Sequence, residues 1–449
     1  MSSMPLLEML KKRGFAQGVH PPENKDVTQG RPIRRLAFAP RMVIPLSQHL
    51  GRPAVPLVHP GQEVVRGEPI ARADGFLSVP MHAPATGVIE AIELMPSAKG
   101  PKAESIVLRV YAGDNQQVLY GAPRDLDTLS RQDIIEGVQD TGMVGLGGAG
   151  FPTHVKLAVP RQHTVDTVVV NGCECEPFLT TDHRIMLEYT EELITGTRIA
   201  MKAVGAERAI IGVEDNKPDA LAAIRAKLPE SGLISVEAVE TKYPQGSEKL
   251  LVKTLLDREI PSGGFPYEAG VVVQNVATLA YIGALLPRGE GMIERVVTIT
   301  GPGVKKPGNY LIAVGTPLRF VLEQLGFTGS ANQLIFGGPM MGTSVASLDA
   351  PVTKAVSAIL VLTEDTVSEE PERTYPCIHC GRCVAACPLH LNPSQLGLLA
   401  AKREYEVMAG RYHLNECFEC GCCSYVCPSG IPLVQYFRIA KSINRERAA

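Results

Sequence analysis

The spacing of hydrophobic and polar positions divides the chain into segments of different character. Residues 1–35 are rich in Pro and charged residues and predict an irregular N-terminal extension. Residues 36–115 contain short runs of β-type residues separated by turns with Pro and Gly, such as PGQEV, RGEPI and HAPATGVI. Short strands between such turns are typical of a small β-sandwich or barrel.

Helix-like and strand-like patterns alternate between residues 125 and 290. SRQDIIEGVQDTG predicts a helix that begins after Ser130 and ends at Gly142, and VDTVVVNG predicts a buried strand. TDHRIMLEYTEELITGTRIAMKAVG predicts one long amphipathic helix, followed by a strand in ERAIIGVED and a helix in KPDALAAIRAKL. This alternation predicts an α/β domain built from β–α units.

The remaining sequence predicts two further domains. Residues 293–365 return to β character, because RVVTITGPGVKKPGNYLIAVGTPLRFVLEQLG has the pattern of strand, turn, strand and helix. TVSEEPERT, at 366–374, predicts a polar linker, and a cysteine-rich helical domain is expected over 370–449. The fold class is therefore multidomain α/β with an all-helical C-terminal domain.

Composition excludes several classes of protein. The chain has 449 residues and a net charge of −3, so no basic surface for nucleic acid is indicated. It has no run of about 18 apolar residues that predicts a transmembrane segment. The N-terminus lacks the pattern of a secretory signal, which favours a cytoplasmic location.

Nine of the 11 cysteines lie between Cys377 and Cys427. CIHCGRCVAACP and CFECGCCSYVCP each have the spacing C-x2-C-x2-C-x3-C-P, which is typical of two-[4Fe–4S] ferredoxins, where the fourth cysteine of each run ligates the other cluster. The alternative, a pair of zinc sites, normally uses two C-x2-C knuckles. The spacing predicts one cluster held by Cys377, Cys380, Cys383 and Cys427, and a second held by Cys417, Cys420, Cys423 and Cys387.

GLGGAGFPTH, from Gly145 to His154, matches the G-x-G-x-x-G spacing of a dinucleotide-binding loop. Such a loop follows a strand, whereas a predicted helix precedes this one, so the alternative is a glycine loop without a ligand. Three other polar segments end predicted strands or precede helices in the same domain: NGCECEP, YPQGSEK and VVVQNVATLA. Ligands of open α/β sheets bind at such an edge.

GLGGAGFPTHVK, NGCECEPFLTTDHR, QGSE and VVVQNVATLA are similar, in order, to motifs of the FMN- and NADH-binding flavoprotein subunit of respiratory complex I. The N-terminal module resembles the barrel-sandwich hybrid fold of lipoyl domains, although ADGFLSVPMHAP lacks their carrier lysine. Residues 293–365 resemble the soluble-ligand-binding β-grasp module. With GVHPPENK and the doubled cysteine run, the chain resembles the C subunits of Rnf (Rsx) electron-transport complexes.

The resemblance implies noncovalent FMN on the glycine loop and NADH stacked over the flavin. It departs from the flavoprotein pattern at Leu146, Cys173 and Ser262. The alternative for Phe265 is a loop residue packed into the core, and for Glu176 and Glu248 it is a solvated or capping role. Cys173 and Cys175 are expected to be buried thiols. The residues expected to contact FMN are Gly145, Gly147, Gly148, Lys156, Asn171, Glu174, Gln274, Asn275 and Thr278, and those expected to meet NADH are Phe151, Glu176, Glu248 and Phe265.

The implied activity is electron transfer between NAD(H), FMN and two [4Fe–4S] clusters, within ferredoxin:NAD+ oxidoreduction coupled to Na+ or H+ movement. No catalytic acid or base is required, since the cofactors carry the chemistry. The expected location is peripheral, on the cytoplasmic side of the bacterial inner membrane. The expected partners are the other subunits, including an iron–sulfur ferredoxin-like subunit. The alternatives are an electron-relay scaffold without flavin, and a soluble diaphorase subunit of a hydrogenase-like complex.

Overall fold

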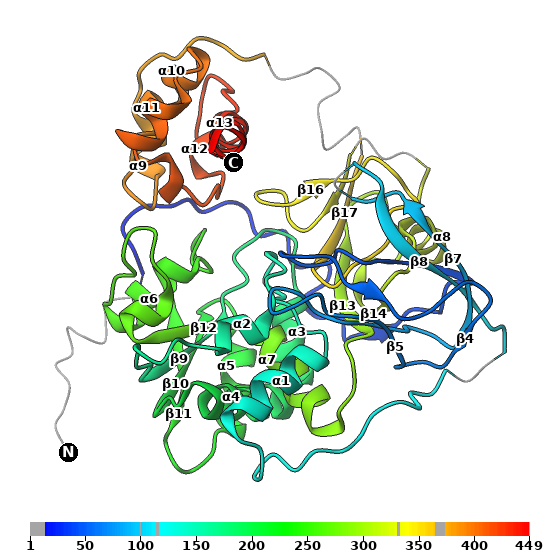
Figure 1. Ribbon diagram of the computed structural model, residues 1–449. Helices are drawn as coiled ribbons and strands as arrows, with labels where there is room; N and C mark the ends of the chain where they lie inside the picture. Colours follow the sequence, from blue (N-terminus) through cyan, green and yellow to red (C-terminus); the bar gives the residue numbers. More distant parts are fainter. Residues whose placement is uncertain (1–13, 99, 114–115, 330–332, 364–372, 449) are drawn as a thin grey trace.

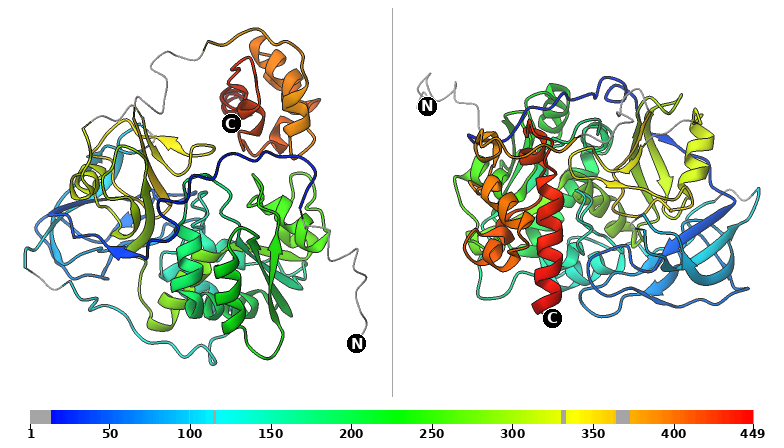
Figure 2. Two further views of the ribbon diagram at one scale, coloured as in Figure 1. Left: turned by 180° about the vertical axis from the view of Figure 1, so that it is seen from behind. Right: turned by 90° about the horizontal axis from the view of Figure 1, so that it is seen from above.

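The chain forms four domains that contact one another (Figure 1). A helical domain lies above a central α/β domain, and two β-rich domains lie beside each other on one flank. Seen from above, the helical domain covers the α/β domain and leaves the N-terminal barrel uncovered (Figure 2). The computed structural model describes residues 14–98, 100–113, 116–329, 333–363 and 373–448.

The N-terminal barrel consists of two small antiparallel sheets, in the orders β2-β8-β7-β4 and β3-β5-β6. Fully buried side chains such as Ile70, Met81 and Ile106 fill the space between them. The β5–β6 hairpin is fixed to the next domain because Gln139 donates to the carbonyl oxygens of Gly75 and Ser78. The strands are β2 (Arg41–Pro45), β3 (Val55–Pro56), β4 (Glu63–Val64), β5 (Pro69–Arg72), β6 (Met81–His82), β7 (Gly87–Met95) and β8 (Ala103–Val110).

The central domain contains a parallel sheet with the order β11-β10-β9-β12. All four strands end at the same edge, which is where the polar segments identified in the sequence lie. The strands are β9 (Thr167–Gly172), β10 (Arg208–Glu214), β11 (Ile234–Val239) and β12 (Val271–Asn275). The helices are α1 (Arg131–Asp140), α2 (Thr153–Leu157), α3 (Thr181–Glu188), α4 (Thr190–Val204), α5 (Pro218–Lys227), α6 (Glu248–Leu256) and α7 (Val276–Leu285), with short 3-10 turns at Pro266–Ala269 and Leu286–Arg288.

Helix α1 begins and ends as predicted. Ser130 and Asp133 form a reciprocal capping box, and Gly142, with φ of +69°, follows the helix end. The prediction of one long helix after residue 180 is wrong. The backbone leaves helical geometry at Tyr189, with φ of −124° and ψ of 35°, and separates α3 from α4.

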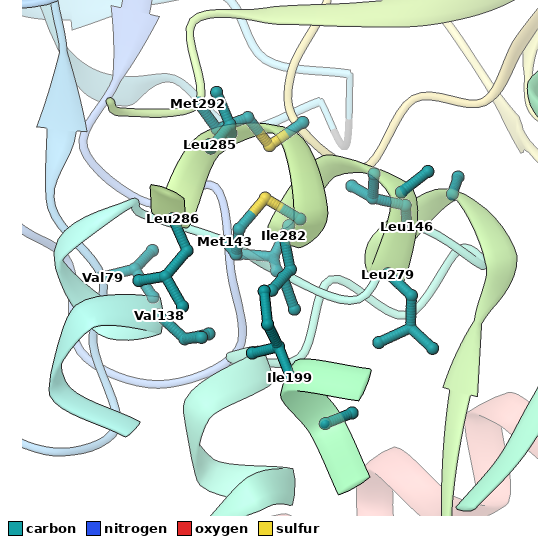
Figure 3. Packing of buried hydrophobic residues seen from close by; sticks show 14 of the residues in the cluster. Val79, Val138, Met143, Leu146, Ile199, Leu279, Ile282, Leu285, Leu286 and Met292 are labelled. Carbon is teal, nitrogen blue, oxygen red and sulfur yellow. The ribbon is translucent and has the colours of Figure 1, made fainter. Parts of the chain in front are cut away.

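Helix α7 is the centre of the largest core. It crosses α4 closely, which is possible because Gly196 of α4 has no side chain. A Cβ at this position would lie only 1.8 Å from the carbonyl oxygen of Leu279. Figure 3 shows Leu279, Ile282 and Leu285 of α7 packed among side chains of α1 and α4 and near Val79 of the barrel. The barrel and the α/β domain therefore share one hydrophobic core.

The third domain is a six-stranded mixed sheet with the order β1-β14-β13-β17-β15-β16. Arg34 and Arg35 form β1 and pair in parallel with Tyr310 and Leu311, so the predicted N-terminal extension is not irregular throughout. Helix α8 (Leu318–Leu325) packs its apolar side chains on this sheet. The strands are β1 (Arg34–Arg35), β13 (Glu294–Thr300), β14 (Gly308–Ala313), β15 (Gln333–Phe336), β16 (Thr343–Ser344) and β17 (Ala358–Leu362).

The helical domain has its own small core, with Leu396, Leu414 and Phe437 at its centre. Residues 14–19 pass between this domain and the α/β domain (Figure 1), where the N–H of Gly18 donates to Ala386 O. Most of the predicted linker, up to residue 372, lies outside the described residues. The helices are α9 (Arg382–Ala386), α10 (Pro393–Ala401), α11 (Tyr405–Gly410), a 3-10 turn (Leu414–Glu416), α12 (Cys422–Tyr425) and α13 (Leu433–Ala448).

Candidate functional site

A cavity of about 400 Å³ lies at the carboxyl edge of the parallel sheet. This volume is in the usual range for pockets that bind small molecules. Its walls come from the glycine loop, the segments after β9 and before α6, and the start of α7, together with two residues of the β-grasp domain and two of the helical domain. Six of the predicted cofactor contacts line it, namely Gly147, Asn171, Glu174, Glu176, Glu248 and Asn275.

The glycine loop is a turn closed by two backbone hydrogen bonds, and Gly147 and Gly148 at its tip are exposed to solvent. The N–H of Gly145 donates to Phe151 O at 2.7 Å, and the N–H of Gly150 donates back to Gly145 O. Gly148 has φ of +115°, which favours glycine, and a Cβ built there would meet nothing within 4 Å. The loop therefore leaves room for a ligand to approach the backbone.

The N-terminus of α7 borders the same cavity. Asn275 caps the helix by accepting from the N–H of Thr278, and the Thr278 hydroxyl accepts from the N–H of Leu146 in the glycine loop. This network joins the loop to the helix end. The partial positive charge of a helix N-terminus favours an anionic group, such as a phosphate or a reduced flavin ring.

Asp182 is a cavity residue that the sequence analysis missed. Its carboxylate accepts from the side-chain amide of Asn275 at 2.7 Å. Burial and the neighbouring Glu174 raise the pKa of Asp182 to about 7. The only signal in the sequence was its place in TTDHR, directly after the NGCECEP segment.

Glu174 and Glu176 both hold backbone segments in place. Glu174 accepts from the backbone N–H groups of Asp182 and His183, at the start of α3. Glu176 accepts from the N–H groups of Met340 and Met341 in the β-grasp domain, at 3.1 and 2.7 Å. Burial is the main reason that the pKa of Glu176 is raised. These carboxylates join the cavity wall to its neighbouring elements.

Lys156 and Glu248 form an ion pair beside the cavity. Lys156 Nζ lies 2.6 Å from Glu248 Oε1 and 3.4 Å from Val273 O. Each side chain is 34% exposed, so both remain open to exchange partners with a ligand.

The other seven predicted contact residues are not part of the cavity wall. Gly145, Gly148, Lys156 and Thr278 belong to the loop, ion pair and helix end described above, and the remaining three are Phe151, Gln274 and Phe265. Phe151 is half-buried behind the loop, and Gln274 is buried with its amide nitrogen unpartnered among the described residues. Phe265 is 56% exposed and stacks on Tyr267 with ring centroids 5.3 Å apart. The alternative that Phe265 packs into the core is therefore wrong.

Cys173 and Cys175 also line the cavity. Cys173 is buried and its thiol donates to Gly212 O, whereas Cys175 is half-buried and its sulfur accepts from the N–H of Gly246. Burial raises the pKa of Cys175 to about 12, so this thiol is protonated at neutral pH.

The first predicted cluster site is a cavity of about 190 Å³ in the helical domain. Four thiols line it, and they are those that the ferredoxin pattern assigns to one cubane: Cys377, Cys380, Cys383 and Cys427. Cys427 comes from the second cysteine run and lies close enough to Cys383 to affect its pKa. A shared cavity with four thiols fits the ligand set of a [4Fe–4S] cluster.

The second predicted site also combines both runs. Burial raises the pKa of Cys417 to about 11, and its neighbours include Cys420 and Cys387. Burial likewise raises the pKa of Cys423, and the thiolates of Cys417, Cys420 and Cys387 add to this rise. Cys387 therefore lies with the second run, as the crossed ligation pattern requires. Cys422, the extra thiol, is fully buried and hydrogen-bonded to Cys420, whose pKa it lowers.

The loop of the second cysteine run reaches the cavity at the sheet edge. Phe418 and Glu416 form part of the cavity wall. Glu416 also pairs with Lys249 at 2.8 Å and accepts from Ser262, one of the positions where the sequence departs from the flavoprotein pattern. Tyr243 lines the cavity, and its hydroxyl donates to Cys420 O at 2.6 Å. The second cluster site is thus the one beside the cavity.

Comparison with known proteins gives matches along most of the chain. Residues 13–112 match the RnfC barrel sandwich hybrid domain and residues 138–284 match the Nuo51 FMN-binding domain. Residues 296–344 match the SLBB domain and residues 376–431 match a 4Fe-4S dicluster domain. The chain is 41% identical over 434 residues to the C subunit of the proton-translocating ferredoxin:NAD(+) oxidoreductase complex of Clostridium ljungdahlii, covering 96% of this chain and 94% of that one. The chain belongs to the RnfC family.

A second RnfC relative has the same level of identity. The C subunit of the Na(+)-translocating ferredoxin:NAD(+) oxidoreductase complex of Acetobacterium woodii is 41% identical over 388 residues, with 86% of each chain covered. The structure of an NAD+-reducing [NiFe]-hydrogenase in the H2-reduced state matches with a TM-score of 0.50 and 20% identity, over 72% of this chain and 67% of that chain. That likeness concerns the fold alone.

These matches confirm the predicted family and fold class. This RnfC chain carries an FMN-binding domain and a dicluster domain for two [4Fe–4S] clusters, and it is a subunit of a multi-subunit oxidoreductase complex. None of the helices in the described ranges has the length and hydrophobicity of a membrane span. The individual contact residues and the domain boundaries stay predictions.

Proposed function

We propose that this chain is the peripheral NADH- and FMN-binding subunit of a bacterial membrane complex. It carries electrons between NAD(H), FMN and two [4Fe–4S] clusters, as part of ferredoxin:NAD+ oxidoreduction coupled to Na+ or H+ translocation. The observation that supports this most is the cavity shared by the glycine loop and the second cysteine run, through Phe418 and Tyr243. FMN, when bound, converts a two-electron hydride into single electrons.

The residues around the cavity suit FMN in charge and shape. The open backbone of Gly147 and Gly148 accommodates close approach, and the N-terminus of α7 favours anionic oxygens. Lys156 supplies a positive charge that is free to leave Glu248 for a ligand oxygen. Asn171 is held against the start of α6, because its amide donates to Gly246 O at 2.8 Å.

NADH is expected to meet the outer part of the same cavity. Glu248 lies there, paired with Lys156, and its carboxylate is available to accept from a ribose hydroxyl once Lys156 turns to the flavin. Phe265, which lies outside the cavity wall, offers an exposed aromatic face and stacks on Tyr267. Glu176 is bonded to the β-grasp domain, so its contribution is to shape the wall.

The proposed location is the cytoplasmic side of the inner membrane, where NADH is available. The proposed partners are the other subunits of the complex, among them an iron–sulfur ferredoxin-like subunit. The second cluster, beside the flavin cavity, takes the position of first electron acceptor from flavin, and the first cluster lies farther out. Two observations support this order. Within the described chain, the wall of the first cluster site contains only residues from 374–436, whereas the loop of the second cysteine run contributes Glu416 and Phe418 to the wall of the flavin cavity.

The test is the cofactor content of the anaerobically purified chain. One noncovalent FMN and about eight irons are expected per chain, since each cubane has four irons. NADH is expected to bleach both the flavin and the cluster absorbance. Iron without flavin and without reduction by NADH would support the relay scaffold instead, and about four irons would contradict the two-cubane assignment.

A further inference from the structure

The first cluster site opens to the surface of the protein. Every residue that lines its cavity belongs to the helical domain, within residues 374–436, so no other described domain covers it. Cys380, one of the four thiols, is itself exposed. The second site differs, because its loop is packed against Tyr243 and the flavin cavity.

The mouth of the first site has an exposed apolar rim. Tyr375, Ile378 and Leu398 line the cavity and are 56%, 66% and 37% exposed, respectively. An exposed group of large apolar side chains around a redox centre indicates a place where another protein excludes water.

Basic side chains surround this rim. Residues 373–403 contain four Lys or Arg residues and no Asp or Glu. All four are exposed, and none forms an ion pair within the described part of the chain. Each lies within one or two positions of a residue in the cavity wall. They are Arg373, Arg382, Lys402 and Arg403.

This local charge differs from that of the whole protein. The chain has a net charge of −3, whereas residues 373–448 contain nine Lys or Arg and five Asp or Glu. The nearest acidic residues after Arg403 are Glu404 and Glu406, and Glu406 pairs with Arg447. Before Arg373, the segment 364–372 contains five acidic residues, so the test must separate their effect.

We propose that the surface around Tyr375, Ile378 and Leu398, with its basic rim, docks an acidic one-electron carrier protein onto the first cluster. The inference rests on the proposed function and adds the site and the charge of the partner. The apolar rim supplies contact close to the cluster, and the basic rim accelerates and orients the encounter. Small contacts of this kind are typical of transient electron-transfer complexes.

The test uses two haem proteins of opposite net charge, acidic cytochrome b5 and basic cytochrome c, as electron acceptors from the full chain. One NADH gives NAD+, H+ and two electrons, and each electron reduces one ferric haem to the ferrous state. The variants are Arg373→Gln/Lys402→Gln and Arg373→Glu/Lys402→Glu. The control is Arg198→Glu at an exposed position of α4 in the α/β domain, which changes the net charge by as much as the double Gln variant does.

The second-order rate constant with cytochrome b5 is expected to fall about tenfold or more in the Glu variant at low ionic strength, and by less in the Gln variant. Raising the salt concentration is expected to lower the wild-type rate toward that of the variants, since the Debye length shortens. Cytochrome c is expected to respond in the opposite direction. The Arg198→Glu control is expected to keep the wild-type rate constants with both cytochromes. The rate at which NADH bleaches the clusters is expected to be the same in all variants.

Equal rates with cytochrome b5 in wild type and both variants would overturn the proposal. A second result would also overturn it. If changing Glu369, Glu370 and Glu372 to Gln in the otherwise wild-type chain raises the rate with cytochrome b5 by as much as the Glu variant lowers it, the basic rim serves the chain's own linker. Loss of binding to phosphatidylglycerol vesicles in the variants, with unchanged cytochrome b5 rates, would assign the rim to lipid instead.

The proposed function can fail separately from the docking surface. If NADH does not reduce the clusters, the proposed function is wrong, and the same comparison is made with protein reduced by dithionite. A charge-dependent rate with cytochrome b5 under those conditions still supports the docking surface.

Discussion

The hydroxyl of Tyr243 donates a 2.6 Å hydrogen bond to the carbonyl oxygen of Cys420, although the two residues are 177 positions apart. Tyr243 is 1% exposed, and its backbone pairs with Val19 of the N-terminal segment. Tyr243 thus joins the cavity at the sheet edge, the loop of the second cysteine run and the segment that passes between the domains.

Tyr243→Phe is expected to lower the free energy of unfolding by about 1–3 kcal/mol, because Cys420 O is left buried without a donor. Urea denaturation of the anaerobic, iron-loaded protein measures this. Tyr425→Phe, at a position that is 50% exposed in the helical domain, is the matched control and is expected to change stability by less than about 0.5 kcal/mol. Equal losses in the two variants would contradict the role given to Tyr243.

Lys156→Gln is expected to raise the dissociation constant of FMN at least tenfold, since a hydrogen bond from a charged donor contributes about 1.5–3 kcal/mol. Quenching of flavin fluorescence on titration measures the affinity. Lys253→Gln is the control, because Lys253 lies on α6 but pairs with Asp257 and Glu259. An unchanged affinity in Lys156→Gln would remove this lysine from the FMN site.

The predicted crossed ligation of the clusters determines for which double substitutions the losses of iron are additive. Cys387→Ala and Cys417→Ala are each expected to lose about four irons, and the double variant no more than either one, because both thiols serve the second cluster. Cys387→Ala combined with Cys377→Ala is expected to lose about eight irons, since it removes a ligand from each cluster. If the pair from one run, Cys377 and Cys387, behaves as a single site, the crossing is wrong. Iron analysis and the EPR spectrum of the reduced protein are the readouts.

His82 predicts a specific loss of stability in acid. Burial, with the charge of Lys354 nearby, lowers the pKa of His82 to about 3. The unfolded chain binds a proton at this imidazole below about pH 6.5, whereas the folded chain does not until about pH 3. The unfolded state therefore holds more protons in this window, and the free energy of unfolding falls by about 2 kcal/mol between neutral pH and pH 5.

His82→Gln is expected to remove this part of the acid sensitivity. Urea denaturation at pH 7 and pH 5 gives the difference, and His59→Gln, at an exposed position of the same barrel, is the control. If wild type and His82→Gln lose the same stability between the two values of pH, the acid effect arises elsewhere.

Much of the fold follows from local patterns. Ser130 with Asp133 specified the start of α1, and Asn275 with Thr278 specified the start of α7, because a helix cap involves only residues within one turn. The break at Tyr189 escaped prediction, since the apolar periodicity continues through it and only packing in three dimensions separates α3 from α4.

The sequence by itself determined the cofactor classes of this protein. The two C-x2-C-x2-C-x3-C-P runs predicted the thiol donors, and the glycine loop with its companion segments indicated a ligand at the sheet edge, because these motifs depend on short-range spacing. Only the tertiary structure decided which cluster site lies beside the cavity, that Glu176 is held by Met340 and Met341, and that Asp182 joins the wall. These relations link residues from different domains or elements, and their geometry depends on how the hydrophobic cores pack, which no local spacing specifies.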